Sequence, residues 1–227
     1  MPNVIEMKKI NKIYTNGSYQ THVLHDIDLS IAEGSFNSII GQSGSGKSTL
    51  LNILGTLDQP TSGEIFIDQN RTDQMKKREL ASLRNQTMGF IFQFHYLLPE
   101  YTALENVLMP YRIRHGKVPD SERKRAINLM DLVGLSEVRN NLATKMSGGQ
   151  QQRTAIARAL MNQPKIILAD EPTGNLDSDT TDTINAMLRD INKELGTTFI
   201  IITHDRRIAE QADRIIEIKD GRIILDI

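Results

Sequence analysis

The chain has 227 residues and a formal net charge of −1, so it is long enough for one large domain and carries no overall basic signature of nucleic-acid binding. It contains no cysteine, which excludes disulfides and thiolate chemistry. It has neither an apolar run near the ~18 residues that span a bilayer nor signal-peptide character at its start, so any membrane role is expected to require a partner.

The first part of the chain, up to about residue 68, predicts short β-strands. Residues 23–31 alternate between apolar and polar, residues 36–40 form a short apolar run typical of a buried strand, and residues 63–68 offer a further strand. Between these strands, the apolar residues within 48–57 recur at helical spacing and predict a helix.

Residues 41–49 lie between the predicted strand and this helix, and they fit the phosphate-loop pattern G-x-x-x-x-G-K-[ST]. Glycines let backbone N–H groups approach a phosphate closely, and the helix that follows adds its positive N-terminal dipole. Lys47 is expected to reach the β- and γ-phosphates, and the Ser48 hydroxyl is expected to bind Mg²⁺. The alternative, a flexible Gly/Ser-rich loop, is disfavoured by the flanking elements. The predicted nucleotide-binding residues here are Gly41, Ser43, Gly44, Ser45, Gly46, Lys47, Ser48 and Thr49.

The middle of the chain, from about Thr102 to Leu142, predicts helices. Thr102 and Glu105 have the spacing of a capping box, which would begin one helix, and residues 121–133 would form another that is charged on one side. The chain therefore predicts a helical insert in this region.

The last third predicts alternating strands and helices. Residues 166–170 and 199–203 are apolar runs of the kind that buried parallel strands show, and a helix is expected between them over 179–194. Residues 215–225 predict a hairpin that turns at Asp220-Gly221. The sum of these elements is an α/β core.

Asp170 and Glu171 follow the apolar run 166–169 directly. This puts Asp170 at the carboxyl end of a strand, the edge at which open α/β sheets bind ligands, and Asp170 is expected to hold Mg²⁺. Glu171 would face the opposite way if the extended conformation continued, and it is the candidate that polarises the attacking water. The alternative is a solvated acidic pair at an ordinary strand end.

Residues 147–153 predict a second helix N-terminus. Ser147 and Gln150 have capping-box spacing, Gly148 and Gly149 lie between them, and an Ala-rich helix follows. Such a terminus is a ready anion site, although a capped helix without a ligand would show the same pattern.

Together these motifs resemble the nucleotide-binding domains of ABC transporters, and the resemblance covers the whole chain as one domain, residues 1–227. It implies a P-loop NTPase of the ABC ATPase type, with a mixed sheet core, an antiparallel β subdomain and a helical subdomain over about 94–146. The Ser-Gly-Gly-Gln run is the signature motif of the family. The family usually has Leu where Met146 stands, a similar-sized apolar residue, so we expect little effect.

The resemblance also implies further contacts around the nucleotide. His204 would contact the γ-phosphate, and Gln93 would sense Mg²⁺ and the attacking water and link the core to the insert. A lone histidine elsewhere would more often be structural, and local sequence alone would favour a polar strand end for Gln93.

Two assignments at the edges of the site follow from the same resemblance. Tyr14 matches the aromatic residue that stacks on adenine, with Tyr19 as a weaker competitor and a surface tyrosine as the alternative. Residues 175–177 match the D-loop, in which Asp177 would reach across a dimer, and the family often has a small residue where Asn175 stands.

In this family, the signature motif of one subunit closes on ATP that the phosphate loop of the other subunit holds. The chain carries one copy of each motif, so the resemblance implies a homodimer formed through ATP, with Mg²⁺ as cofactor. It also implies a separate transmembrane permease that contacts the apolar and aromatic segment 94–99, directly after Gln93, although packing within the insert would account for part of that segment. The chain is then expected to be peripheral at the cytoplasmic face of the inner membrane.

Residues 93–107 and 170–177 resemble one branch of the family most closely. Members of this branch drive lipoprotein release from the inner membrane, macrolide or peptide export, or cell division. The resemblance is closest to the lipoprotein-releasing ATPases. However, these ATPases commonly carry a charged variant after the two glycines, where this chain has Gln150, Gln151 and Gln152, so the other two functions remain alternatives.

Other classes of protein fit the sequence less well. A GTPase would need an Asn-Lys-x-Asp motif, and the Asn-Lys pairs at 11–12 and 192–193 both lack the Asp. Chromosome and repair ATPases insert a long coiled coil between the two nucleotide motifs, and translation factors carry two ABC units. A nucleotide-binding scaffold without turnover is the non-enzyme alternative, which Glu171 and His204 argue against.

Overall fold

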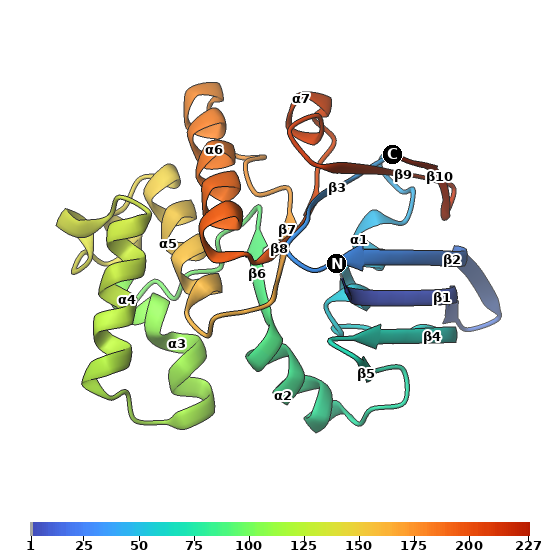
Figure 1. Cartoon of the computed structure of the whole chain (residues 1–227), viewed down its shortest axis with the longest axis horizontal. Helices are drawn as coiled ribbons and strands as arrows, with labels where there is room; N and C mark the ends of the chain where they lie inside the picture. The colour runs from blue at the N-terminus through green and yellow to red at the C-terminus, as the bar shows by residue number, and fades with distance from the viewer. Residues whose placement is uncertain (1) are drawn as a thin grey trace.

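The structure is a computed structural model that describes residues 2–227, and a six-stranded sheet forms its centre (Figure 1). The strands are, in spatial order, β10 (Arg222–Asp226), β9 (Arg214–Lys219), β3 (Phe36–Ile40), β8 (Thr198–Ile202), β7 (Ile166–Asp170) and β6 (Met88–Phe92). All neighbours pair in parallel except β9 and β10, which form an antiparallel hairpin. The predicted parallel strands and the predicted hairpin are therefore confirmed.

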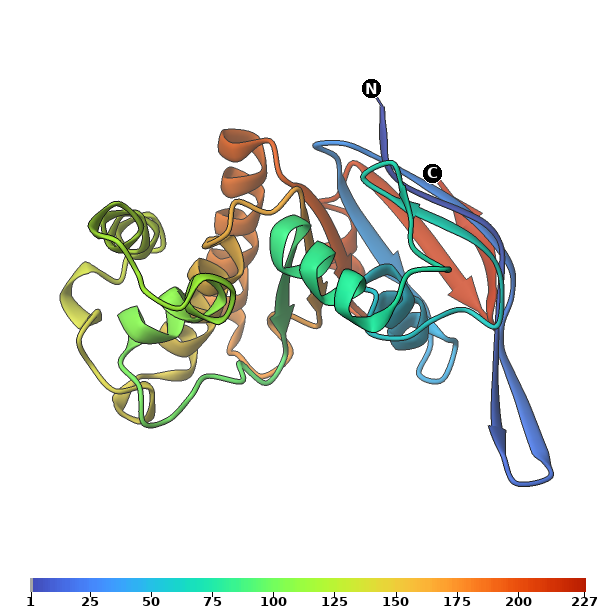
Figure 2. The ribbon, with the colours of Figure 1, turned by 90° about the horizontal axis from the view of Figure 1, so that it is seen from below.

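A second, antiparallel sheet has the order β2-β1-β4-β5. Its strands are β1 (Asn3–Asn16), β2 (Tyr19–Ala32), β4 (Ser62–Ile67) and β5 (Asn70–Arg71). The prediction of short strands was wrong for β1 and β2, which have 14 residues each and extend as a ribbon beyond the rest of the sheet (Figure 2). Register shifts, as between Met7 and Ile10, break the alternation that would mark one long strand in the sequence.

Helices cover those parts of the six-stranded sheet that the antiparallel sheet does not cover (Figure 1). They are α1 (Lys47–Leu54), α2 (Lys77–Thr87), α3 (Ala103–His115), α4 (Asp120–Leu132), α5 (Gly148–Leu160), α6 (Ser178–Leu195) and the short α7 (Arg206–Ala209). The predicted insert, 94–146, contains α3, α4 and two 3₁₀ turns, Ser136–Val138 and Ala143–Lys145. Helix α2 was not predicted, because only Leu80 and Thr87 of its residues are buried and so no apolar period marks it.

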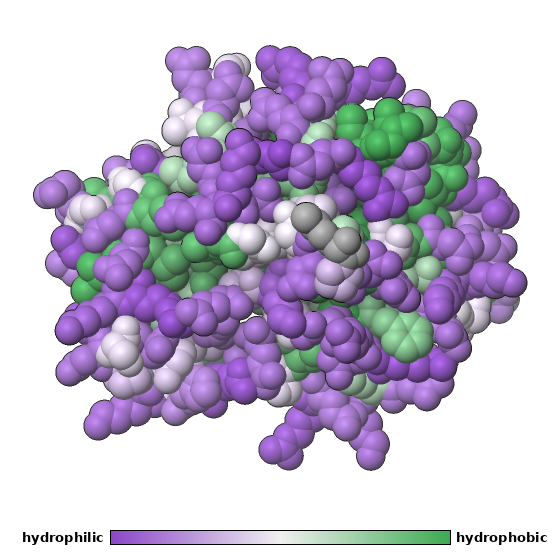
Figure 3. All heavy atoms as spheres, viewed as in Figure 1, coloured by the Kyte–Doolittle hydropathy of each residue, from purple (hydrophilic) through white to green (hydrophobic). Residues whose placement is uncertain are grey.

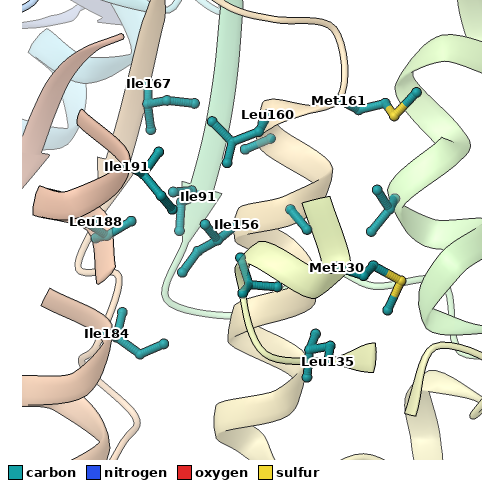
Figure 4. Packing of buried hydrophobic residues seen from close by; sticks show 14 of the residues in the cluster. Ile91, Met130, Leu135, Ile156, Leu160, Met161, Ile167, Ile184, Leu188 and Ile191 are labelled. Carbon is teal, nitrogen blue, oxygen red and sulfur yellow. The ribbon is translucent and has the colours of Figure 1, made fainter. Parts of the chain in front are cut away.

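The central strands are buried on both faces and separate two cores. Along β7, Ile167 and Ala169 pack with the helices, whereas Ile166 and Leu168 pack with α1 and the antiparallel sheet. This two-residue alternation is the normal geometry of a strand. Figure 4 shows the core on the helical side, where residues of α5 and α6 meet those of β6 and β7. The two cores hold the carboxyl ends of the parallel strands in place.

The helix termini follow the predicted capping patterns. Thr102 and Ser147 cap α3 and α5 through capping boxes with Glu105 and Gln150, which confirms both predictions. The surface in the view of Figure 3 is largely hydrophilic, with apolar residues gathered over the β9–β10 edge. Across residues 2–227, the structure contains no helix that combines the length and the apolarity needed to cross a membrane.

Candidate functional site

The loop between β3 and α1 has a backbone that only glycine fits well. Gly41 has φ 153°, and a Cβ there would lie 2.2 Å from the carbonyl oxygen of Ile218. Gly46 has φ 105°, and a Cβ added there would lie 2.9 Å from the Leu24 side chain of β2. The loop is therefore enclosed by segments from both sheets, and its close packing needs these two glycines.

Lys47 and the start of α1 form the positive side of this loop. The Lys47 ammonium donates to the carbonyl oxygens of Gly41 at 2.8 Å and Gln42 at 2.9 Å, so the side chain curls back over the loop. The N-cap of α1 is Gly46, which has no side chain to satisfy the first N–H groups. Those N–H groups and the helix dipole together suit an anion.

A cavity of about 450 Å³ opens over the loop at the carboxyl ends of β7 and β8. Its lining combines the phosphate-loop residues with the three polar residues predicted to act beside them. The lining residues are Val23, Ser43, Gly44, Gly46, Lys47, Ser48, Thr49, Asp170, Glu171, Ile202 and His204. Elements that are far apart in the chain thus meet at one edge of the sheet, as expected for an open α/β fold.

Asp170 carries a carboxylate that a cation would stabilise. Burial raises its pKa, the neighbouring Glu171 charge raises it further, and Lys47 acts in the opposite direction. Among residues 2–227, no cluster of three or more His, Cys, Asp or Glu side chains could hold a metal by itself. Mg²⁺ usually takes one or two protein oxygen ligands together with substrate phosphates, so Ser48 and Asp170 in one cavity fit this ion.

Glu171 departs from the extended conformation on which its predicted orientation depended. Its φ is 46°, in the left-handed region, and its N–H donates to the Ile202 carbonyl at 2.9 Å. The strand therefore turns at Glu171, and its Oε1 lies 2.7 Å from Nδ1 of His204. The Glu171 side chain is 19% exposed and that of His204 is 74% exposed. Backbone strain of this kind costs about 1–3 kcal/mol and clusters at functional sites.

Gln93 contacts the D-loop segment. Its Nε2 donates to Oδ1 of Asn175 at 3.0 Å, and Nδ2 of Asn175 donates back to the Gln93 carbonyl at 3.3 Å. A Cβ on Gly174 would lie 2.7 Å from Nε2 of Gln93, so the glycine permits this approach. Within the described residues, Gln93 is not part of the cavity lining. No local pattern in the sequence predicted the contact between the amides of Gln93 and Asn175.

The signature segment lies at a separate place on the surface. Ser147 is exposed, and its Oγ accepts from the Gln150 N–H at 3.3 Å while its own N–H donates to Oε1 of Gln150 at 3.0 Å. A Cβ on Gly149 would lie 2.9 Å from the Thr180 methyl group of α6. Asp177 caps α6 through the Thr180 N–H at 3.0 Å. Within residues 2–227, the lining of the cavity over the phosphate loop does not include Ser147, Gly149 or Asp177.

Tyr14 and Tyr19 occupy different parts of the β1–β2 ribbon. Tyr19 is 82% exposed and pairs with Asn16 next to the turn of the ribbon. Tyr14 is 41% exposed, and its hydroxyl donates to Oδ2 of Asp58 at 2.8 Å. The two tyrosines are therefore not equivalent, because only Tyr14 is held to the core.

A groove of about 620 Å³ lies between α2, β6, α3 and α5. Phe90, Phe92 and Ile113 are apolar residues of its lining, and Arg84, Arg114 and Arg158 line it as well. The lining is completed by Ala81, Ser82, Asn85, Met88, Gly89, Pro110, Ala159 and Asn162.

The segment that follows Gln93 is tied to one side of this groove. Arg158 donates to the carbonyl oxygens of His95 at 2.7 Å and Tyr96 at 2.6 Å. Phe94 and Tyr96 project outward, with 61% and 66% exposed. An apolar hollow and exposed aromatic side chains thus lie together.

Comparisons with known proteins agree with this arrangement. The ABC transporter family model matches residues 24–174. The chain is 49% identical over 224 residues to the lipoprotein-releasing system ATP-binding protein LolD 1 of Rhodopseudomonas palustris, covering 98% of this chain and 99% of the relative.

Two solved structures are similar over nearly the full length. One is the dimeric structure of MJ0796, a bacterial ABC transporter cassette, with a TM-score of 0.89, 45% identity and coverage of 98% of this chain and 97% of that one. The other is a dimeric post-hydrolysis state of MJ0796 bound to ADP and Pi, with a TM-score of 0.89, 44% identity and the same coverage.

Proposed function

The chain belongs to the ABC transporter family, and from this premise we propose that it is the ATP-hydrolysing subunit of a complex that releases lipoproteins from the inner membrane. The family membership makes the chain an ATP-binding cassette and an ATPase. The lipoprotein substrate is supported by the name of the relative that is 49% identical over 98% of this chain. In this role the subunit is peripheral, at the cytoplasmic face of the membrane.

The observation that carries the proposal is the cavity that holds Lys47 beside Asp170 and Glu171. The loop N–H groups and Lys47 bind the β- and γ-phosphates. Ser48 and Asp170 would hold Mg²⁺, which would supply positive charge beside the phosphates. Gln93, whose amide bonds Asn175 in this structure, would also help to hold the ion.

Glu171 acts as the base for the attacking water. Its side chain is 19% exposed, so it reaches the cavity while remaining oriented by His204 at 2.7 Å. A positioned general base contributes about 10²- to 10⁴-fold to a rate. His204, the more exposed partner, contacts the γ-phosphate.

The second half of the site comes from another copy of the chain. Ser147, Gly148, Gly149 and Gln150 lie at an exposed helix N-terminus outside the cavity, so a second subunit can bring them to the triphosphate. Asp177 lies at the same surface. ATP then joins two subunits, because it binds the closed dimer more tightly than the open one. Hydrolysis removes ATP, and the closed dimer is no longer favoured.

The partner in the membrane docks beside Gln93. The groove between α2, β6, α3 and α5 has apolar lining residues of the kind that a short amphipathic helix requires, and Phe94 and Tyr96 extend the contact surface. Movement of the dimer is thereby transmitted to a separate permease.

A mixing experiment tests the shared site. Lys47→Ala removes the phosphate-loop lysine, and Ser147→Arg blocks the signature surface, so each variant alone is expected to lose ATPase activity. In a mixed dimer, one site combines the intact phosphate loop of one variant with the intact signature of the other. Random pairing of equal amounts should restore about a quarter of the wild-type phosphate release, because half the dimers are mixed and half their sites are intact.

The control is a mixture of two preparations of the same variant, which should stay inactive at every protein concentration. If the Lys47→Ala and Ser147→Arg mixture also stays inactive, although both variants form mixed dimers, the shared site is refuted.

A further inference from the structure

Lys12 is a buried cation that lies against the ring of Tyr14. Only 9% of the residue is exposed, and its ammonium lies 4.7 Å from the centroid of the Tyr14 ring. The ammonium donates to Oδ1 of Asp58 at 2.7 Å and to the Gln59 carbonyl at 2.8 Å. These two acceptors hold the cation in place over one face of the aromatic ring.

Asp58 also bonds the hydroxyl of Tyr14 and so fixes the position of the ring. Its second oxygen accepts the Tyr14 hydroxyl at 2.8 Å, so one carboxylate binds both the cation and the phenol. Burial acts to raise the pKa of Asp58, but the bonds from Lys12 and Tyr14 hold it below its ordinary value. The carboxylate is therefore ionised at neutral pH and stays available to both partners.

The same aspartate connects Tyr14 with α1, the helix that follows the phosphate loop. Asp58 lies in the turn after α1, where its N–H donates to the Asn52 carbonyl at 3.1 Å. The ring, the turn and the helix that begins at the loop thus form one connected unit.

A cation beneath an aromatic ring changes what binds above it. Two stacked aromatic rings repel each other through their negative faces, and a positive charge on the far side of one ring offsets that repulsion. Tyr14 remains 41% exposed although Lys12 covers one of its faces. The arrangement therefore favours a flat, π-rich base on the ring.

We infer that Lys12 and Asp58 position and polarise Tyr14 so that it adds affinity for the base of a bound nucleotide. The inference rests on the proposed function, ATP binding, and on the expectation from the sequence that Tyr14 stacks on adenine. Lys12 and Asp58 are positioning residues, because they act through the ring and do not touch the nucleotide. They add affinity for the base and leave the affinity for the phosphates unchanged.

The test compares a ligand that has the base with one that lacks it. Calorimetry measures the binding of ATP and of inorganic tripolyphosphate to the wild type, to Lys12→Met and to Tyr14→Ala. Lys12→Met keeps the aliphatic stem and removes the charge, so it should weaken ATP binding about tenfold while tripolyphosphate binding stays unchanged. Lys12→Arg, which keeps a cation that can pair with Asp58, should restore most of the ATP affinity.

The outcomes separate the inference from the proposal on which it rests. If Tyr14→Ala weakens ATP binding but Lys12→Met does not, Tyr14 remains the platform and the role of Lys12 is refuted. If Lys12→Met weakens both ligands equally, Lys12 only supports the loop and the inference fails. If Tyr14→Ala leaves ATP binding unchanged, the adenine platform itself is wrong.

Discussion

Oε1 of Glu171 and Nδ1 of His204 lie 2.7 Å apart, at the carboxyl ends of the neighbouring strands β7 and β8. Glu171 reaches this position because the chain leaves the extended conformation there, at φ 46°. With its proton on Nδ1, the imidazole donates to the carboxylate and fixes its direction. The pair therefore orients the carboxylate proposed as the base, at the edge of the cavity that holds Lys47.

Glu171→Gln should lower the rate of ATP hydrolysis by about a hundredfold or more, because an amide cannot accept the proton of the attacking water. ATP binding should persist, since the phosphate loop is untouched. Phosphate release measures the rate, and size-exclusion chromatography with ATP should show an accumulated dimer.

Glu137→Gln provides a matched acid-to-amide control. It changes an exposed carboxylate outside the cavity and should retain much of the hydrolysis rate. Native phosphate release by Glu171→Gln would remove Glu171 from its proposed role.

Gly149→Ala should destabilise the protein through the contact with α6. An added Cβ lies 2.9 Å from the Thr180 methyl group, and overpacking of this kind costs about 1–3 kcal/mol, from which the better helix propensity of Ala subtracts about 0.5–1 kcal/mol. Thr180→Ser removes that methyl group but keeps the hydroxyl that bonds Asp177 at 2.8 Å. Urea unfolding of the double variant should therefore recover most of the loss.

The same pair of variants separates packing from ligand binding at the signature segment. If the double variant regains stability but not ATPase activity, Gly149 is also needed for the approach of the second subunit to ATP. A double variant as unstable as Gly149→Ala would contradict the packing argument.

Ile113→Asp should abolish association with the membrane partner. Ile113 is 76% exposed and lines the groove, so the substitution places a charge where an apolar helix face is expected to bind. Basal ATPase activity of the isolated subunit should stay unchanged. Co-purification of the tagged chain with a transmembrane protein, identified by mass spectrometry, measures the association.

Ile224→Asp is the matched control, because Ile224 is 53% exposed and lies on β10, away from the groove lining. Retained association with Ile113→Asp, or equal loss with both variants, would exclude the groove as the docking site.

Asp73→Asn should destabilise the protein at neutral pH and much less in acid. Burial acts to raise the pKa of Asp73, but bonds from Arg71 and the Ile65 N–H hold it below its ordinary value. A carboxylate with a lowered pKa stabilises the folded state above its unfolded pKa, about 3.9, and loses that contribution as the pH falls through the lower folded value. The difference in urea midpoint between variant and wild type should therefore shrink from pH 7 towards pH 3. A constant difference over this range would show that the ionised form contributes nothing.

Local spacing predicted most of the elements correctly. Strand β3, strand β7 and the capped starts of α3 and α5 lie where the sequence placed them, because each depends on residues a few positions apart. The same kind of spacing did not predict α2, because that helix buries too little apolar surface to show a period. It also underestimated the lengths of β1 and β2, because bulges interrupt their alternation. The roles of the individual site residues stay predictions until the variants above are measured.

The sequence by itself determined the phosphate loop, the carboxylate pair at the end of β7 and the capped signature helix, since each is a short pattern whose geometry follows from its own residues. Only the tertiary structure decided which of these side chains meet. Gln93 and Asn175 are 82 residues apart, Lys12 and Asp58 are 46 apart, and Glu171 and His204 are 33 apart. Contacts over such separations depend on the order of strands in the sheets and on the packing of two cores, which no local period encodes.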